Sequence, residues 1–218
     1  MRLSFVVRRI LEKEKRVKIA ILGPDNAGKT SLLRSFTGEQ VEKISPTFGY
    51  QTVVKDAYIG EKKYSLEILD IGGQESIRSY WDTYYSGIDA VLYVYDTHGT
   101  DLYRGILESV ISHPSLRGAA FICAANKHDS EKSAEDAGPP VRLESAADKE
   151  IKIRSYRIDE ELPFNFLERM EDLKISQAAE EKSVPIVYTS AKTGKNVQHI
   201  FKRLLRMVIE KREKDGIL

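Results

Sequence analysis

Short apolar segments recur along the chain and predict the strands of a sheet. The segments at 90–95 and 119–125 are apolar throughout and too short for helices, which is typical of parallel strands covered on both faces. Two further segments flank Gly60 and predict an antiparallel hairpin. The predicted strands are 16–22, 52–59, 63–69, 90–95, 119–125 and 185–189.

Apolar residues at helical spacing lie ahead of, between and beyond these strands. Leu3, Val6, Val7 and Ile10 share one face of a helix ahead of the first strand, and most of the neighbouring bases lie off that face. Alternating strands and helices predict an α/β fold with a doubly wound, mostly parallel six-stranded sheet, helices on both faces and one antiparallel strand in the hairpin. The predicted helices are 2–13, a helix from about 30 through 36, 102–111, about 164–181 and 197–208.

These elements divide the chain into an N-terminal amphipathic helix at 1–14 and a single domain at 15–218. An insertion at about 130–182 interrupts the alternation, because Pro139–Pro140 blocks a regular start and the following pattern is mixed. Ile151 and Ile153 suggest an extended piece within it. The insertion is a surface for a partner or a tolerated excursion, since long loops cost little free energy.

Composition narrows the classes of function. The 218 residues carry 34 bases and 33 acids, a net charge of +1 that argues against a dedicated nucleic-acid binder. The lone Cys123 excludes a disulfide framework and a multi-cysteine zinc site. The balance hides a net charge of +5 over residues 1–18 and of −5 over residues 130–182. A basic amphipathic helix of this kind is typical of an element that lies on a membrane surface or in a partner groove.

The segment from Gly23 to Thr30 matches the pattern G-x-x-x-x-G-K-[ST] between a predicted strand and a predicted helix, the context of a phosphate-binding loop. In such a loop backbone N–H groups surround phosphate oxygens, the lysine reaches the β- and γ-phosphates, and the threonine hydroxyl binds Mg²⁺. The predicted nucleotide-binding residues here are Asp25, Asn26, Ala27, Gly28, Lys29, Thr30 and Ser31.

A second motif, Asn126-Lys127-His128-Asp129, follows the predicted strand at 119–125 and selects the base. The Asp129 carboxylate would accept two hydrogen bonds from guanine, whereas adenine offers no matching pair of donors. The segment of Ser190, Ala191 and Lys192 follows the last predicted strand and would cover the ring. The predicted ligand is therefore GTP or GDP with Mg²⁺.

Two loop segments supply candidates for catalysis and for the remaining metal contacts. Asp70 follows the strand at 63–69 and suits an acid that holds Mg²⁺ through water. Gly73 offers an N–H to a γ-phosphate, and Gln74 is placed to orient an attacking water. Thr47, between the first domain helix and the hairpin, would complete the metal ligands when the γ-phosphate is present. Lys29, Thr47 and Gln74 are the predicted catalytic set.

Together these motifs resemble those of the Ras superfamily of small GTPases, and more closely its Arf and Arf-like family. The similarity covers about residues 2–130 and 184–214, and it is greatest with the Arf-like subgroup that releases lipidated cargo and works with tubulin-folding cofactors. The residues that carry it are 23–30 (Gly-Pro-Asp-Asn-Ala-Gly-Lys-Thr), 44–50 (Ile-Ser-Pro-Thr-Phe-Gly-Tyr), 70–75 (Asp-Ile-Gly-Gly-Gln-Glu) and 77–81 (Ile-Arg-Ser-Tyr-Trp).

The resemblance implies a GTP/GDP switch. In the family, GTP orders a first switch segment around Thr47 and a second around Gly73, and the hairpin between them slides and displaces the N-terminal helix. Implied partners are an exchange factor, a GTPase-activating protein and effectors. We expect effector contacts through Tyr50, Leu69, Trp81 and Tyr84, with Trp81 packed under the second switch segment.

The resemblance also implies a cytoplasmic monomer whose residues 2–13 contact a membrane surface reversibly in the GTP state. Residue 2 is Arg and the chain ends in Gly-Ile-Leu, so we expect neither myristoylation nor prenylation. Leu69 stands where the family usually has Trp, and Ser190–Lys192 is the Ras-like form of that loop. No arginine is predicted to complete the catalytic site in cis, so hydrolysis should be slow without an activating protein.

Two other functions fit parts of the pattern. One is a GTP-loaded binding module with negligible hydrolysis, and the β-subunit of the signal-recognition-particle receptor is a relative of this kind. Gln74 favours hydrolysis over that alternative. The other is an ATP-using P-loop kinase, which would leave the motif from Asn126 to Asp129 unexplained.

Overall fold

The computed structural model describes residues 15–42, 44–96, 102–128, 142–144, 150–152 and 184–217, with backbone alone at 102–104, 142–144 and 150–152. Within these ranges a six-stranded sheet has the strand order β2-β3-β1-β4-β5-β8, and β6 and β7 form a separate pair. The strands are β1 (Arg16–Leu22), β2 (Tyr50–Ile59), β3 (Lys62–Ile71), β4 (Ala90–Asp96), β5 (Ala120–Asn126), β6 (Arg142–Glu144), β7 (Glu150–Lys152) and β8 (Ile186–Tyr188).

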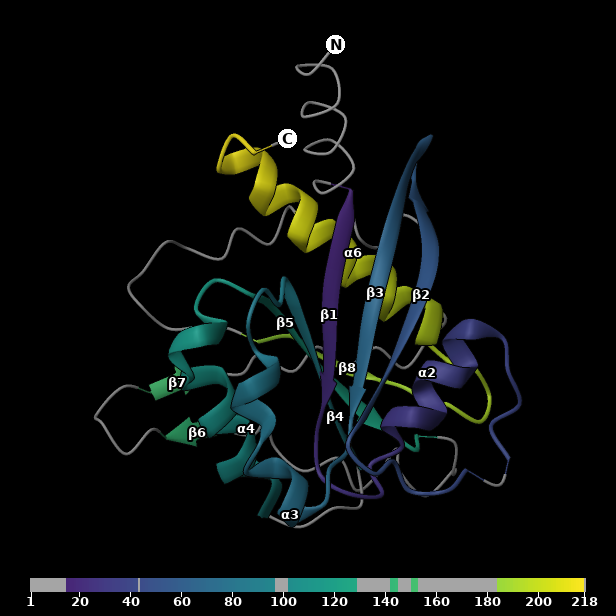
Figure 1. Ribbon diagram of the computed structural model, residues 1–218, viewed down its shortest axis with the longest axis vertical. Helices are drawn as coiled ribbons and strands as arrows, with labels where there is room; N and C mark the ends of the chain where they lie inside the picture. Colours follow the sequence, from purple (N-terminus) through teal and green to yellow (C-terminus); the bar gives the residue numbers. More distant parts are fainter. Residues whose placement is uncertain are drawn as a thin grey trace.

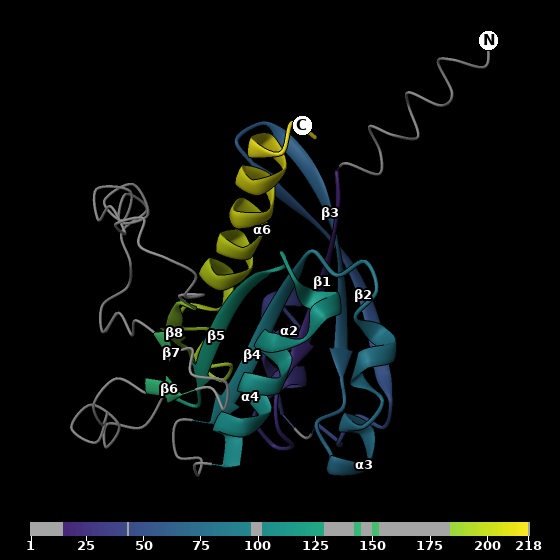
Figure 2. The ribbon, with the colours of Figure 1, turned by 90° about the vertical axis from the view of Figure 1, so that its left-hand side faces the viewer.

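Helices cover both faces of the sheet, as Figures 1 and 2 show. One face packs on α2 and α6 through residues such as Leu32, Phe36 and Phe201, and the Phe36 and Phe201 rings stack 3.9 Å apart. The other face packs on α4 through Leu107 and Val110. The helices are α2 (Lys29–Thr37), α3 (Glu75–Arg78), η1 (Trp81–Tyr84), α4 (Leu102–Ser112), η2 (Pro114–Leu116) and α6 (Val197–Lys214).

All pairings in the main sheet are parallel except that of β2 with β3, which confirms the predicted α/β fold with one antiparallel strand. The two-residue turn at Gly60 and Glu61 sets the hairpin register, with Gly60 in the left-handed region at a φ of 57°. Parallel pairing places the carboxyl ends of β1 and β3 together, because Ile21 lies beside Asp70. The phosphate-binding loop therefore starts next to the second switch segment.

The long hairpin and the last helix reach the same end of the molecule. In Figure 1 the turn of the β2–β3 hairpin, the start of β1 and the end of α6 lie at the top, and α3 lies at the bottom. Among the described helices, none is long and apolar enough to cross a membrane. The buried Cys123 is a core residue, and burial raises the pKa of its thiol to about 12.

Several element boundaries differ from prediction. β2 starts at Tyr50 and β3 continues to Ile71, so Asp70 lies inside its strand rather than after it. Asn126 likewise is the last residue of β5. The structure adds β6, paired with β7 where an extended piece was predicted. The predicted helices at 1–14 and about 164–181, most of the insertion, and Asp129 lie outside the described residues.

Candidate functional site

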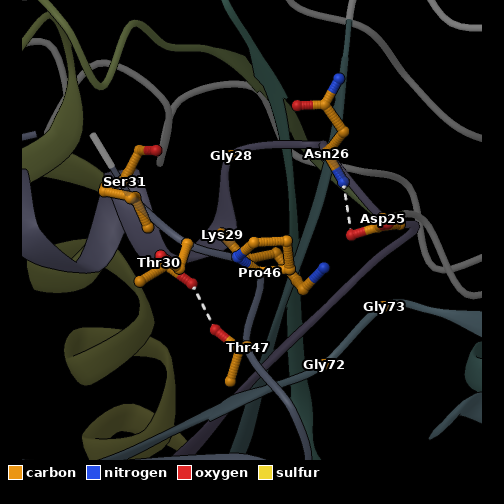
Figure 3. Close-up of a pocket in the computed structure, with 12 residues that line it drawn as sticks. Asp25, Asn26, Gly28, Lys29, Thr30, Ser31, Pro46, Thr47, Gly72 and Gly73 are labelled. Atoms are coloured by element: carbon orange, nitrogen blue, oxygen red, sulfur yellow. Dashed lines mark hydrogen bonds between the residues drawn. The ribbon is translucent and has the colours of Figure 1, made fainter. Parts of the chain in front are cut away.

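A cavity of about 260 Å³ opens where the loop after β1 meets the first and second switch segments. Its walls come from three separate stretches of chain, and Figure 3 shows how their side chains face one another. The lining residues are Asp25, Asn26, Gly28, Lys29, Thr30, Ser31, Ile44, Ser45, Pro46, Thr47, Gly72 and Gly73. The structure thus brings together most of the residues predicted to bind phosphates.

The loop conformation depends on Gly28, which has a φ of 87° immediately before α2. A side chain there would be strained, and its Cβ would also collide with the Asn126 amide nitrogen. That nitrogen, Nδ2, instead donates to the Ala27 carbonyl at 2.9 Å. The amide of Asn126 therefore fixes the phosphate-binding loop from the end of β5.

Lys29 is the first residue of α2, and its buried side chain donates from Nζ to the carbonyls of Gly23 and Pro24, at 3.0 and 2.8 Å. Its amine has a pKa lowered to about 8, chiefly by burial and to a smaller extent by Arg78. Asp70 and Asp25 oppose the shift by favouring the charged form. A buried cation that donates hydrogen bonds to two neutral carbonyls is suited to receive an anion.

Three oxygen-bearing side chains converge beside Lys29. The Thr30 hydroxyl donates to Asp70 Oδ2 at 2.7 Å. It also lies 2.9 Å from the Thr47 hydroxyl, as the dashed line in Figure 3 marks. Asp70 is fully buried, yet its Oδ1 has no hydrogen-bond partner among the described residues. An uncompensated carboxylate oxygen is costly, and hydroxyl and carboxylate oxygens are the ligands that Mg²⁺ prefers. The residues present therefore fit a magnesium ion.

Backbone contacts join the two switch segments to the loop. The Gly72 N–H donates to the Gly49 carbonyl at 2.8 Å. A Cβ at Gly73 would lie 2.5 Å from the Gly23 carbonyl oxygen and the Pro24 carbonyl carbon, so only glycine allows this approach. The buried Trp81 donates from Nε1 to the Gly72 carbonyl at 2.9 Å, which confirms that it packs under the second switch segment.

The predicted base-binding loops meet at the ends of β5 and β8. Asn126 Oδ1 accepts a hydrogen bond from the Ala191 N–H at 3.1 Å, and the His128 N–H donates to the Thr189 carbonyl at 3.0 Å. Lys127 Nζ forms an ion pair with Asp96 at 2.8 Å. The loop of Ser190, Ala191 and Lys192 is thereby tied to the motif that begins at Asn126.

The structure separates the remaining predicted residues. Gln74 is half-buried and immediately precedes α3, and it is not part of the cavity lining. Of the four expected effector contacts, Tyr50 is exposed and packs 4.8 Å from the half-buried Tyr84 ring, whereas Leu69 and Trp81 are buried. Packing on the sheet and the indole hydrogen bond remove these two from the surface. Exposed Phe48 and Tyr80, which the sequence did not indicate, lie in the same switch segments.

Three residues that contact the site residues or shift the pKa of Lys29 were missed from the sequence. Gln51 donates from Nε2 to Asp70 at 2.8 Å, and Asp96 pairs with Lys127. Arg78, in α3, has a buried Nε without a hydrogen-bond partner among the described residues. Only Gln51 had a detectable signal, because counting pairs back from the Gly60 turn places it opposite Asp70.

Comparisons with known proteins agree with this geometry. The model of the ADP-ribosylation factor family matches residues 3–208. ADP-ribosylation factor-like protein 2 of Dictyostelium discoideum is 41% identical over 134 residues, which are 59% of this chain and 70% of the relative. The protein of the same name from Arabidopsis thaliana is 34% identical, over 66% of this chain and 79% of the relative. ADP-ribosylation factor-like protein 3 of Chlamydomonas reinhardtii is 31% identical, over 71% and 88%. This chain therefore belongs to the ADP-ribosylation factor family of GTP-binding small GTPases.

Proposed function

We propose that the protein is a molecular switch that binds GTP, hydrolyses it slowly to GDP, and binds effectors according to the nucleotide it holds. The observation that carries this proposal is the convergence of Lys29, Thr30 and Thr47 on one cavity, with Asp70 accepting a hydrogen bond from Thr30. Three separate segments supply these groups. Loss of the γ-phosphate would therefore change the contacts of both switch segments at once.

The phosphate-binding loop supplies the electrostatic part of binding. Backbone N–H groups over Asp25–Lys29 surround the phosphates, with the N-terminus of α2 adding its positive dipole. Lys29 exchanges two neutral carbonyl acceptors for anionic phosphate oxygens, which form stronger hydrogen bonds. The buried charge of the nucleotide-free protein thus becomes a source of affinity.

Thr30 and Thr47 would hold magnesium through their hydroxyls, and Asp70 would act through its buried carboxylate. When bound, the ion neutralises charge on the phosphates. Thr47 belongs to the first switch segment, so its contribution depends on that segment lying against Thr30 as it does here. Departure of the γ-phosphate would release Thr47 and open the segment.

The base would occupy the end of the sheet beyond β5 and β8. Asn126 fixes the loops around it, Asp129 would accept the hydrogen bonds that select guanine, and Lys127 with Ser190–Lys192 would enclose the ring. Hydrolysis needs a water positioned in line with the γ-phosphate. Gln74 would orient that water, whose oxygen forms the new bond to phosphorus as the bond to the β-phosphate oxygen breaks.

Gly49, Gly72 and Gly73 connect the nucleotide to the partner-binding surfaces. Their backbone contacts hold the two switch segments together only while both lie against the loop. An exchange factor and an activating protein would act on these segments, and effectors would contact exposed Tyr50 beside them. Residues 2–13 would reach a membrane surface reversibly in the GTP state, from a cytoplasmic monomer.

Single-turnover hydrolysis of radiolabelled GTP tests this function. Wild-type protein should retain GTP in preference to ATP and convert it slowly to GDP, and Gln74→Leu should slow the conversion at least about tenfold. Gln198→Leu is a matched control, because Gln198 lies on α6 and is not part of the cavity lining. Equal rates for wild type and Gln74→Leu would exclude the role of Gln74. Retained GTP with no conversion by wild type would favour the binding-module alternative.

A further inference from the structure

The side chain of Gln51 contacts the candidate metal site, although Gln51 belongs to none of the sequence motifs described above. Gln51 lies in β2 directly opposite Asp70 in β3. Side chains of directly opposed residues lie on the same face of the sheet, with their Cβ atoms about 4.5–5.5 Å apart. Gln51 Nε2 uses this placement to donate to Asp70 Oδ2 at 2.8 Å.

This hydrogen bond makes the Asp70 carboxylate asymmetric. Oδ2 accepts from both Thr30 and Gln51, whereas buried Oδ1 has no hydrogen-bond partner among the described residues. Two donors on one oxygen fix the rotation of the carboxylate about its own bond. Oδ1 is then the oxygen left over, at a fixed position, for whatever the site binds.

The two donors on Oδ2 are not equivalent. The Thr30 hydroxyl is also shared with Thr47, and Thr30 and Thr47 are both expected to bind the metal. If the Thr30 hydroxyl binds the metal, its hydrogen bond to Asp70 depends on whether the metal is present. Gln51 is the donor whose hydrogen bond to Asp70 is independent of the ion.

Gln51 also lies at the junction of the first switch segment and the hairpin. It follows Tyr50, whose ring packs 4.8 Å from that of Tyr84 at the end of the second switch segment. The Asp70 carboxylate is therefore held by the strand that continues both from Thr47 and from an exposed aromatic contact. A partner that moves Tyr50 would also disturb the hydrogen bond on Asp70.

We propose that Gln51 is a positioning residue for magnesium, holding the Asp70 carboxylate in the orientation that the ion requires and linking the ion to the first switch segment. This role rests on the proposed function, because it assumes a magnesium-dependent nucleotide site. Outer-shell partners of metal ligands commonly contribute about ten- to a hundredfold in metal affinity.

The test is the release of a fluorescent, non-hydrolysable GTP analogue measured across a series of free Mg²⁺ concentrations. Gln51→Leu should raise the Mg²⁺ concentration needed for half-maximal retention by about tenfold or more. With EDTA in place of Mg²⁺, wild type and variant should release the analogue at the same rate, because Gln51 then has no ion to support. At saturating Mg²⁺ their rates should converge again, which also shows that the variant is folded.

Gln198→Leu is the matched control, since it too removes one part-buried amide hydrogen bond, of 3.0 Å to the Phe36 carbonyl. It should leave the Mg²⁺ dependence unchanged. An unchanged dependence in Gln51→Leu, or release accelerated equally in EDTA, would overturn the positioning role. Wild-type release that is insensitive to Mg²⁺ would instead overturn the proposed metal site, and the two failures are thus distinguishable.

Discussion

Lys29 is the residue whose charge state decides how strongly the site attracts a phosphate. Its pKa of about 8 is far below the ordinary 10.5, chiefly because the amine is buried. The protonated form binds phosphate, so affinity for GDP should fall as pH rises through 8, by about fourfold between pH 7 and 8.5. Binding measured by fluorescence titration across this range checks the prediction.

The stability of the nucleotide-free protein should move in the opposite direction. Lys29 has a folded-state pKa below its unfolded value, so between about pH 8 and 10.5 the unfolded chain binds more protons and folding stability rises with pH. Lys29→Arg retains its charge throughout and should lose both dependences, whatever its overall affinity. Persistence of the same pH profile in Lys29→Arg would assign the titration to another group.

The sequence predicted which residues form the site but not the contacts between them. The loop at Gly23–Thr30 and the pair of Asp70 and Thr47 were predicted as nucleotide and metal contacts. The structure places most of the loop and Thr47 around one cavity, with Asp70 hydrogen-bonded to Thr30. The carbonyl partners of Lys29 and the orphaned Oδ1 of Asp70 could not be predicted. Both depend on three-dimensional packing, which cannot be read from residue type or spacing.

At the scale of elements, the second switch segment is a short, mostly exposed stretch anchored by one buried side chain. α3 has only four residues, none of them buried, so packing alone holds it weakly. Trp81, at the start of η1, is buried and donates to the Gly72 carbonyl at 2.9 Å. The indole therefore ties the far end of the segment back to the end of β3.

Trp81→Phe should keep most of the ring packing but leave the buried Gly72 carbonyl without its donor. The expected loss is about 1–3 kcal/mol in the free energy of unfolding, measured by urea denaturation. Tyr80→Phe is the adjacent control, because Tyr80 is 61% exposed and its change should stay within about 0.5 kcal/mol. A loss in Tyr80→Phe as large as that in Trp81→Phe would mean that the segment is held by something other than the indole.

Strand bounds could be predicted where apolar residues determine them. They were predicted less well where hydrogen bonding to a partner strand determines them. β1 has the predicted bounds, since its buried end is continuous with the core. β2 extends back to Tyr50 because the hairpin partner β3 continues to Ile71, and ladder hydrogen bonds do not require apolar side chains. β6 was missed for the same reason, being a three-residue strand defined by its pairing with β7.

At the scale of the whole molecule, hydrogen bonds join β1 to α6, two elements that lie far apart in the sequence. Asp89, just before β4, accepts the Lys18 N–H on Oδ2 at 2.8 Å and Arg212 on Oδ1 at 2.7 Å. The guanidinium of Arg212 also donates twice to the Arg16 carbonyl, at 3.1 Å each. One carboxylate thus joins β1, the start of β4 and α6. The start of β1 and the end of α6 lie at the end of the molecule opposite α3 (Figure 1).

Asp89→Ala should destabilise the entire domain rather than one element. It removes an acceptor from a backbone N–H and from an arginine whose side chain is only 14% exposed, for an expected loss of about 2–3 kcal/mol in urea-induced unfolding. Asp56→Ala is the control, because its ion pair with Lys63 has side chains 50% and 56% exposed and its loss should leave the midpoint of unfolding nearly unchanged. The contacts of Asp89 join residues that are 71 and 123 positions apart in the sequence. The unfolding transitions reported by different spectroscopic probes should therefore shift together. Loss confined to α6, seen as separate transitions, would show that the last helix is an independent unit and that Asp89 does not close the domain.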